Sequence, residues 1–208
     1  MRNENLIIGI LIILQLVGVL ALWFEIHPDF ILLTPINLLV TFGLVMANHK
    51  EHVGRTAIVL AISFVIGFLV ELAGVNYGVL FGDYAYGPVL GPKVHHTPLM
   101  IGFNWAMLVY CSGVVSNALF AQRLWVLRAL VGAALMTTMD VLIEPVAVHY
   151  NFWTWSGDGI PLSNYRDWFL VSLVLHILFQ RMLPQIRNKA GIALFVLQMA
   201  FFFLIGLK

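Results

Sequence analysis

Seven mostly apolar runs, most of them close to 20 residues long, follow one another along this sequence. A helix needs about 20 apolar residues to cross the hydrocarbon core of a bilayer, because its backbone rises about 1.5 Å per residue. The chain is also 61% hydrophobic and only 10% charged, unlike soluble domains. The sequence therefore predicts an all-α integral membrane protein, a bundle of about seven transmembrane helices with residues 1–208 as a single transmembrane domain. The expected helices are 6–24, 30–47, 55–73, 98–120, 125–148, 168–183 and 190–207.

Basic residues are distributed unevenly between the two ends of this predicted bundle. Of the 11 Lys and Arg, all but Lys93, Arg166 and Lys208 belong to the N-terminus and the loops after the second, fourth and sixth helices. Cytoplasmic loops are enriched in Lys and Arg. We therefore expect a multi-pass protein of the cell membrane with the N-terminus in the cytoplasm and the C-terminus outside. The first apolar run is expected to be a retained anchor, since no A-x-A cleavage site follows it. No nucleic-acid partner is expected, because the basic residues flank helices and form no patch.

Two acids, Asp140 and Glu144, interrupt the apolar run 125–148 and are followed directly by Pro145. A charged side chain near the centre of a bilayer costs roughly 2.5–3.5 kcal/mol, so an intramembrane acid indicates a functional site. Residues four apart lie on one face of a helix, which places both carboxyl groups in one pocket. Pro145 lacks a backbone N–H, and we expect the helix to kink or end there.

Two long connections, 74–97 and 149–167, are rich in glycine, proline and aromatic residues. Loops of this length in a compact bundle are usually functional or disordered, and the aromatic content argues against disorder. Both are predicted on the non-cytoplasmic face. Their aromatic residues could also form a plain interfacial belt, as Trp and Tyr do in many membrane proteins.

Three further residues are predicted at the depth of the two acids. Glu71 closes the third helix at the face of the aromatic loops, and Asn104 and Trp105 belong to the start of the fourth. The sequence therefore predicts one polar pocket, lined by these residues and the acids and roofed by the aromatic loops.

Several carboxyl groups in a low-dielectric pocket cannot all ionise, so at least one is expected to stay protonated and to act as a proton donor. The other acids can orient a water molecule. The indole faces of Trp105, Trp153 and Trp155 can stabilise a transient carbocation. This combination favours acid-initiated chemistry on an apolar substrate, in which a C=C bond is protonated and water captures the cation.

Other kinds of functional site, such as a metal site or a retinal site, fit the sequence less well. His49-x-x-His52 and the pair His95-His96 are predicted on opposite faces, so they cannot share a metal. A metal held by the second pair and a nearby acid is a minor alternative, and no metal is expected. The last helix has no internal lysine for a retinal Schiff base. Single amides in the first, second and last helices are expected to be interhelical hydrogen-bonding groups: Gln15, Asn37 and Gln198.

An ordered set of short motifs covers residues 71–168, close to half of the chain. The set is Glu71-Leu-Ala-Gly74, Phe81-Gly-Asp83-Tyr84-Ala-Tyr86-Gly-Pro88, Pro98-Leu-Met-Ile-Gly102-Phe-Asn104-Trp105, Asp140-x-x-x-Glu144-Pro145, Trp153-Thr-Trp155 and Gly159-Ile-Pro161-x-x-Asn164-Tyr165-x-x-Trp168. Each motif alone is weak, but in this order they resemble the carotenoid biosynthesis membrane proteins of the CruF type.

The resemblance implies a carotenoid 1,2-hydratase, which adds water across the terminal C1=C2 double bond of an acyclic carotenoid end and leaves a tertiary alcohol. The implied substrates are γ-carotene, lycopene or the C50 precursor of bacterioruberin, taken from the bilayer, with water as co-substrate and no cofactor. A cofactor-free carotenoid cyclase or isomerase is the nearest alternative. A proton-coupled transporter and a pigment-binding protein are alternatives from other classes.

The predicted catalytic residues are the three acids. Asp140 or Glu144 donates the proton, and Glu71 or the remaining acid positions the water. Asn104 and Tyr84 are expected to hold that water. The predicted set that contacts substrate or cation is Asn104, Trp105, Tyr84, Tyr86, Asp83, Trp153, Trp155, Asn164 and Trp168.

Overall fold

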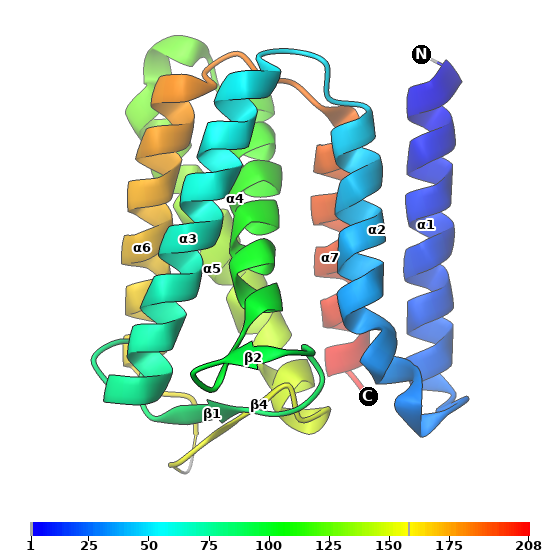
Figure 1. The fold of residues 1–208 in the computed structure, drawn as a ribbon. Helices are drawn as coiled ribbons and strands as arrows, with labels where there is room; N and C mark the ends of the chain where they lie inside the picture. Colours follow the sequence, from blue (N-terminus) through cyan, green and yellow to red (C-terminus); the bar gives the residue numbers. More distant parts are fainter. Residues whose placement is uncertain (1, 158) are drawn as a thin grey trace.

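The computed structural model describes residues 2–157 and 159–208, and within them it contains seven long α-helices that run roughly side by side (Figure 1). The two termini lie at opposite ends of the bundle (Figure 1). The helices are α1 (Arg2–Trp23), α2 (Thr34–Ala47), α3 (Val53–Tyr77), α4 (Leu99–Leu119), α5 (Trp125–His149), α6 (Leu162–Met182) and α7 (Lys189–Gly206). The short elements are the 3-10 helices η1 (Pro28–Leu33) and η2 (Gln122–Leu124) and the strands β1 (Tyr84–Tyr86), β2 (Lys93–Val94), β3 (Thr97–Pro98) and β4 (Trp153–Trp155).

In the described part of the chain, six helices are long and apolar enough to cross a bilayer. The exception is α6, which is as long as α4 but carries several polar residues on its buried face. The prediction of an all-α membrane bundle is confirmed. All seven expected helices are present, and they differ from expectation mainly in where they begin and end.

Three helix boundaries differ from the prediction for local reasons. The expected helix 30–47 starts as the 3-10 helix η1, because Pro35 has no N–H for an α-helical bond to the carbonyl of Ile31; the Thr34 hydroxyl donates to that carbonyl instead, at 2.7 Å. Helix α3 continues to Tyr77 and ends at Gly78, whose φ of 62° suits glycine. Helix α6 begins at Leu162, so Asn164 belongs to a helix and not to a loop.

Pro145 does not end its helix, and that alternative in the prediction is wrong. Helix α5 continues for four more residues to His149. A proline removes one backbone hydrogen bond, while Glu144, Val146 and Ala147 on both sides of it are buried against neighbouring elements. Packing on both sides therefore keeps the last turn helical.

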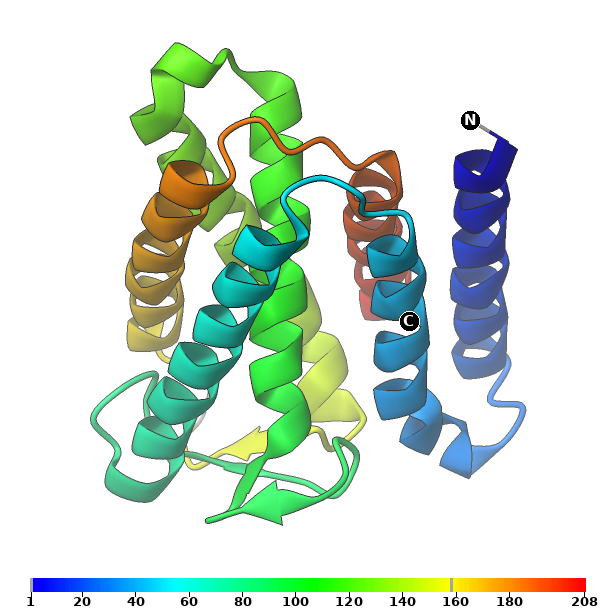
Figure 2. The ribbon, with the colours of Figure 1, turned by 45° about the horizontal axis from the view of Figure 1, so that its top comes forward.

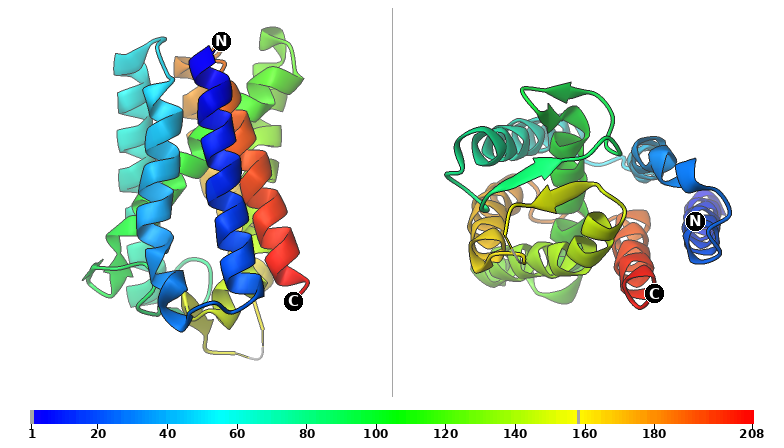
Figure 3. Two further views of the ribbon diagram at one scale, coloured as in Figure 1. Left: turned by 90° about the vertical axis from the view of Figure 1, so that its right-hand side faces the viewer. Right: turned by 90° about the horizontal axis from the view of Figure 1, so that it is seen from below.

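Helix α4 lies at the centre of the bundle and is the most deeply buried span (Figure 2). Helices α3, α5 and α6 pack around it on one side, and α1, α2 and α7 form a second group beside them, as the view from below shows (Figure 3). The paired strands β1 and β4 lie across the end of the α3–α6 group (Figure 3). The structure thus places both long loops at one end of the bundle, as expected.

Glycines let the central helices approach closely. A Cβ atom at Gly132 of α5 would lie 2.2 Å from Cδ2 of His176 in α6, and one at Gly67 of α3 would lie 2.4 Å from Cβ of Trp105 in α4. Small residues at such positions are typical of packed membrane helices.

We expect Gly132→Ala to lower the free energy of unfolding by about 1–3 kcal/mol, the usual cost of overpacking. His176 cannot move aside easily, because its ring is fully buried and contacts Ser112 and the Ser172 carbonyl at hydrogen-bonding distance. Thermal unfolding in detergent measures the change. The control is Gly43→Ala in α2, where a Cβ meets nothing within 4 Å. Equal melting temperatures for the two variants would contradict this packing.

Candidate active site

The two aromatic loops pair with each other to close one end of the bundle. Strand β1 runs antiparallel to β4, with Tyr84 opposite Trp155 and Tyr86 opposite Trp153. Because side chains alternate along a strand, each Tyr-x-Tyr or Trp-x-Trp motif turns both of its aromatic rings toward one face. Both tyrosines are buried, while Ala85 between them is exposed. The ring centroids of Tyr84 and Trp155 lie 5.1 Å apart. The motifs therefore form one aromatic layer over the helix ends.

Glu71 of α3 lies beneath this layer and accepts three hydrogen bonds. The hydroxyl groups of Tyr84 and Tyr86 donate to its Oε2 at 2.6 and 2.7 Å, and Nε1 of Trp105 donates to its Oε1 at 2.9 Å. The residue as a whole is 2% exposed. Three donors suit an acceptor-only, ionised carboxylate.

The two phenols are held as hydrogen-bond donors. Burial, together with the neighbouring Glu71, raises the pKa of Tyr84 and of Tyr86 well above the ordinary value. Both hydroxyl groups therefore stay protonated across the physiological pH range and keep their bonds to Glu71.

Glu144 of α5 is the second acid with three donors. The indole N–H groups of Trp153 and Trp155 donate to its Oε2 at 3.1 and 3.0 Å, and Nδ2 of Asn164 donates to its Oε1 at 3.2 Å. The same Asn164 nitrogen donates to Oδ2 of Asp140 at 2.8 Å. Asn164 therefore bridges the two acids that the sequence predicts to share a pocket.

Asp140 differs from the other two acids in its hydrogen bonds. It is fully buried, and its Oδ1 has no hydrogen-bond partner among the described residues. A carboxylate oxygen buried without a donor is costly, whereas a protonated carboxyl group carries an O–H that can donate to a substrate or water. Asp140 is thus the acid whose surroundings best suit a neutral carboxyl group.

Two stacked indoles form the wall between α4 and α6. The rings of Trp105 and Trp168 are nearly parallel, with centroids 4.2 Å apart. The ring centroid of Phe81 lies 6.4 Å from the centroid of each indole. Phe81 also has a positive φ of 66°, which is rare for a phenylalanine. Its backbone N–H donates to Oδ2 of Asp167 at 2.9 Å, and its carbonyl accepts from the Ser163 hydroxyl at 3.0 Å. Contacts from α6 therefore hold the Phe81 backbone in this conformation.

The space enclosed by these residues is about 10 Å³, close to the minimum for one water molecule. Its lining combines the acids with aromatic rings, one amide and one aliphatic side chain. The lining residues are Glu71, Phe81, Tyr84, Tyr86, Ile101, Asp140, Glu144, Trp153, Trp155, Asn164 and Trp168.

The structure brings together most of the predicted site residues, but two lie elsewhere. Asp83 is exposed, and its carbonyl accepts a hydrogen bond from the backbone N–H of Ser156. Asn104 lines a neighbouring apolar cavity and not the acid pocket. Successive residues of a helix point about 100° apart, so the adjacent Asn104 and Trp105 face different sides of α4. His95 and His96 are exposed in the turn between β2 and β3.

Three residues of the site were not predicted from the sequence. Phe81 and Ile101 line the pocket, and Asp167 anchors Phe81. Ile101 looks like any apolar residue of a membrane helix. Phe81 and Asp167 both lie inside the matching motifs, but their contact joins residues 86 positions apart and no spacing rule indicates it.

We expect Tyr84→Phe to lower the free energy of unfolding by about 1–3 kcal/mol, since it removes one donor from a buried carboxyl group. Thermal unfolding in detergent measures the loss. Tyr77→Phe is the matched control, because Tyr77 is 74% exposed at the same end of α3. A melting temperature for Tyr84→Phe equal to that of the control would argue against the Glu71 cluster.

Comparisons with known proteins agree with the resemblance seen in the motifs. The bisanhydrobacterioruberin hydratase of Haloarcula japonica is 27% identical to this chain over 136 residues, which cover 60% of this chain and 45% of that relative. The match thus spans less than half the length of the curated relative. No solved structure matches the chain. A family model described as carotenoid biosynthesis protein matches residues 30–208. Because this match covers most of the sequence, the chain belongs to the carotenoid biosynthesis protein family.

Proposed function

We propose that this protein is a carotenoid hydratase, which adds water across the terminal C1=C2 bond of an acyclic end group of γ-carotene, lycopene or a related carotenoid. The observation that carries the proposal is the buried aromatic pocket with three carboxyl groups. Of these, only Asp140 has an oxygen without a hydrogen-bond partner among the described residues. Family membership supports a carotenoid substrate, and the relative's name supports the addition of water.

Asp140 acts as the general acid in this proposal. Its O–H proton passes to C2, the π electron pair forms the new C–H bond, and C1 becomes a tertiary cation. The donor must be neutral in the resting pocket, and Asp140 meets this condition best because Glu71 and Glu144 each accept three hydrogen bonds. General acids of this kind contribute about 10²–10⁴-fold to the rate.

The aromatic walls stabilise the cation that forms. Indole faces attract positive charge, and burial strengthens the effect. The N–H groups of Trp153 and Trp155 are engaged with Glu144, and that of Trp105 with Glu71. The bonds to Glu144 fix the orientation of Trp153 and Trp155, two indoles that line the pocket, so that their faces lie beside the cation.

Water completes the reaction. A water oxygen in the acid pocket bonds to C1, and the proton it loses returns to the Asp140 carboxylate, either directly or through Glu144. Asn164 links the two acids by bonds of 2.8 and 3.2 Å from one nitrogen. The sum of the steps is the carotenoid plus one water, and the protein returns to its starting state without a cofactor.

The proposed setting is the cell membrane, with the carotenoid drawn from the bilayer. By the distribution of basic residues, the N-terminus faces the cytoplasm, and the aromatic sheet and the C-terminus face the outside. The acids then lie within the bilayer, close to its outer surface, where water can reach them.

Asp140→Asn should reduce the hydroxylated product by at least about a hundredfold, the lower range for loss of a general acid. The assay is pigment analysis by mass in a host that makes lycopene. Glu71→Gln and Glu144→Gln should also lower the yield, because each weakens the cluster around the donor. The control is Asp29→Asn, since the Asp29 side chain is 73% exposed. Wild-type product from Asp140→Asn would refute its role as the acid.

Water labelled with ¹⁸O separates hydration from the nearest alternative. A hydratase places the labelled oxygen in the tertiary alcohol. A cyclase or isomerase starts from the same protonation but loses a proton or closes a ring, and it leaves the product without labelled oxygen. An altered carotenoid without the label would therefore overturn the proposal.

A further inference from the structure

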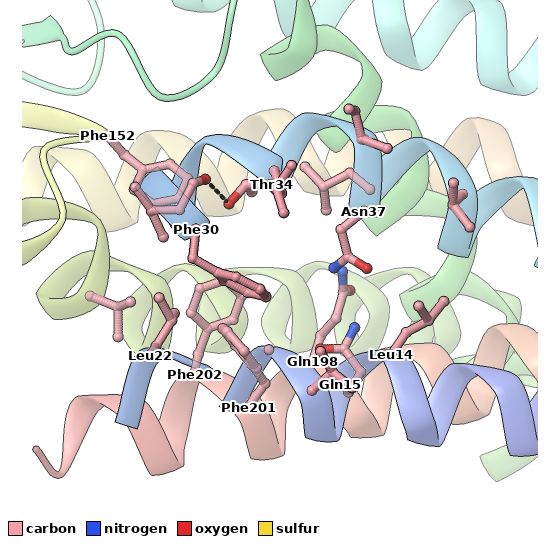
Figure 4. A pocket seen from close by; sticks show the side chains of 18 residues that line it. Leu14, Gln15, Leu22, Phe30, Thr34, Asn37, Phe152, Gln198, Phe201 and Phe202 are labelled. Atoms are coloured by element: carbon pink, nitrogen blue, oxygen red, sulfur yellow. Dashed lines mark hydrogen bonds between the residues drawn. The ribbon is translucent and has the colours of Figure 1, made fainter. Parts of the chain in front are cut away.

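A large apolar cavity lies away from the acids, between α1, η1, α2 and α7 (Figure 4). Its volume is about 320 Å³. Aliphatic side chains and phenylalanines make up most of its wall, including Phe30, Phe201 and Phe202 (Figure 4). On α1 the lining runs from Leu14 to Leu22, which corresponds to about 12 Å along the helix. The cavity is therefore elongated along the bundle.

A smaller cavity of about 50 Å³ lies between this space and the acid pocket. It shares five lining residues with the large cavity, namely Thr34, Leu38, Phe152, Gln198 and Phe202. It shares Ile101 and Trp153 with the acid pocket. Trp153 donates its N–H to Glu144, so one indole forms both the end wall of the apolar path and part of the acid site. The three spaces form a series.

The large cavity reaches the surface of the bundle that faces lipid. Val17 of α1 and Ile36 and Val40 of α2 line it, and they are 49%, 60% and 45% exposed. These apolar side chains mark an opening between α1 and α2. A lipid-soluble molecule can enter there without passing through water.

Gln198 of α7 lies on the wall shared by the large and the intermediate cavity. It is 4% exposed, its Nε2 contacts only the weak acceptor Met107 Sδ, at 3.8 Å, and its Oε1 has no partner among the described residues. Figure 4 shows it beside Asn37 and Gln15, the other amides that we expected to join helices. Gln198, Asn37 and Gln15 are thus polar groups in an otherwise mostly apolar wall.

We propose that the apolar path binds the isoprenoid chain of the substrate, which enters between α1 and α2 and extends one end through the intermediate cavity to Trp153 and the acids. The occupant is a linear, apolar polyene, because the path is elongated, open to lipid and leads to a site for alkene protonation. Asn104, which lines the intermediate cavity, then contacts the end of the chain. This inference rests on the proposed function for the identity of the chain.

The test places a larger side chain in the path from each of two helices, α1 and α2. Leu38→Trp obstructs it at the junction of the two cavities, and Leu14→Trp obstructs it from α1. Their neighbours Leu39 and Ile13 point to lipid, with exposures of 47% and 61%, so Leu39→Trp and Ile13→Trp are matched controls. Each variant is purified in detergent from a lycopene-producing host, with and without Asp140→Asn. The lycopene bound per protein and the hydroxylated product are both measured.

In the Asp140→Asn background, both obstructing variants should bind at least tenfold less lycopene. In the wild-type background, both should give at least tenfold less hydroxylated product. The controls should keep both. Thermal unfolding identifies folded variants, and because Leu14 and Leu38 lie on different helices, either folded variant is sufficient. Wild-type lycopene binding in a folded obstructing variant overturns the path, even if the protein hydrates lycopene. Binding that depends on Leu38 and Leu14 without any hydration supports the path and rejects the proposed reaction.

Discussion

The structure depends on a single constraint, which is that three carboxyl groups are buried in a membrane helix bundle. An unpaired charge in such surroundings costs several kcal/mol, so each acid needs hydrogen-bond donors or a proton. No lysine or arginine supplies a counter-charge to them among the described salt bridges. Hydrogen bonds from neutral donors stabilise the acids instead. These donors are two phenols, three indoles and one amide. The aromatic residues that satisfy the acids are also the walls of the pocket.

The pairing of β1 with β4 explains why two distant loops carry Tyr-x-Tyr and Trp-x-Trp. A period of two directs both rings of each motif to one face, and the antiparallel register places each tyrosine opposite a tryptophan. The loop with β1 donates hydrogen bonds to Glu71, and the loop with β4 donates hydrogen bonds to Glu144. The sheet also ties the ends of α3 and α5 together. Fold and site are therefore the same set of contacts at this end of the bundle.

Hydropathy and the polar interruptions of apolar runs predicted the helices, the shared depth of the acids and the role of the loops as a roof. Those features follow from local sequence and from the dimensions of a bilayer. Three features could not be predicted from local sequence, because they depend on contacts between distant segments. They are the strand pairing, the early start of α6 and the orientation of Asn104 away from the acids. The apolar path is the clearest example. Its wall consists of ordinary leucines and phenylalanines, and only the packing of α1, α2 and α7 makes them a cavity.

In the proposed mechanism, Asp140 holds a proton, while Glu71 and Glu144 are carboxylates stabilised by hydrogen-bond donors. Infrared difference spectroscopy of the purified protein at neutral pH tests this most directly, because a protonated carboxyl group has its own C=O stretching band. We predict one such buried band in the wild type that disappears in Asp140→Asn and remains in Glu71→Gln and in Glu144→Gln. A band that persists in Asp140→Asn and disappears in one of the glutamate variants would contradict the account.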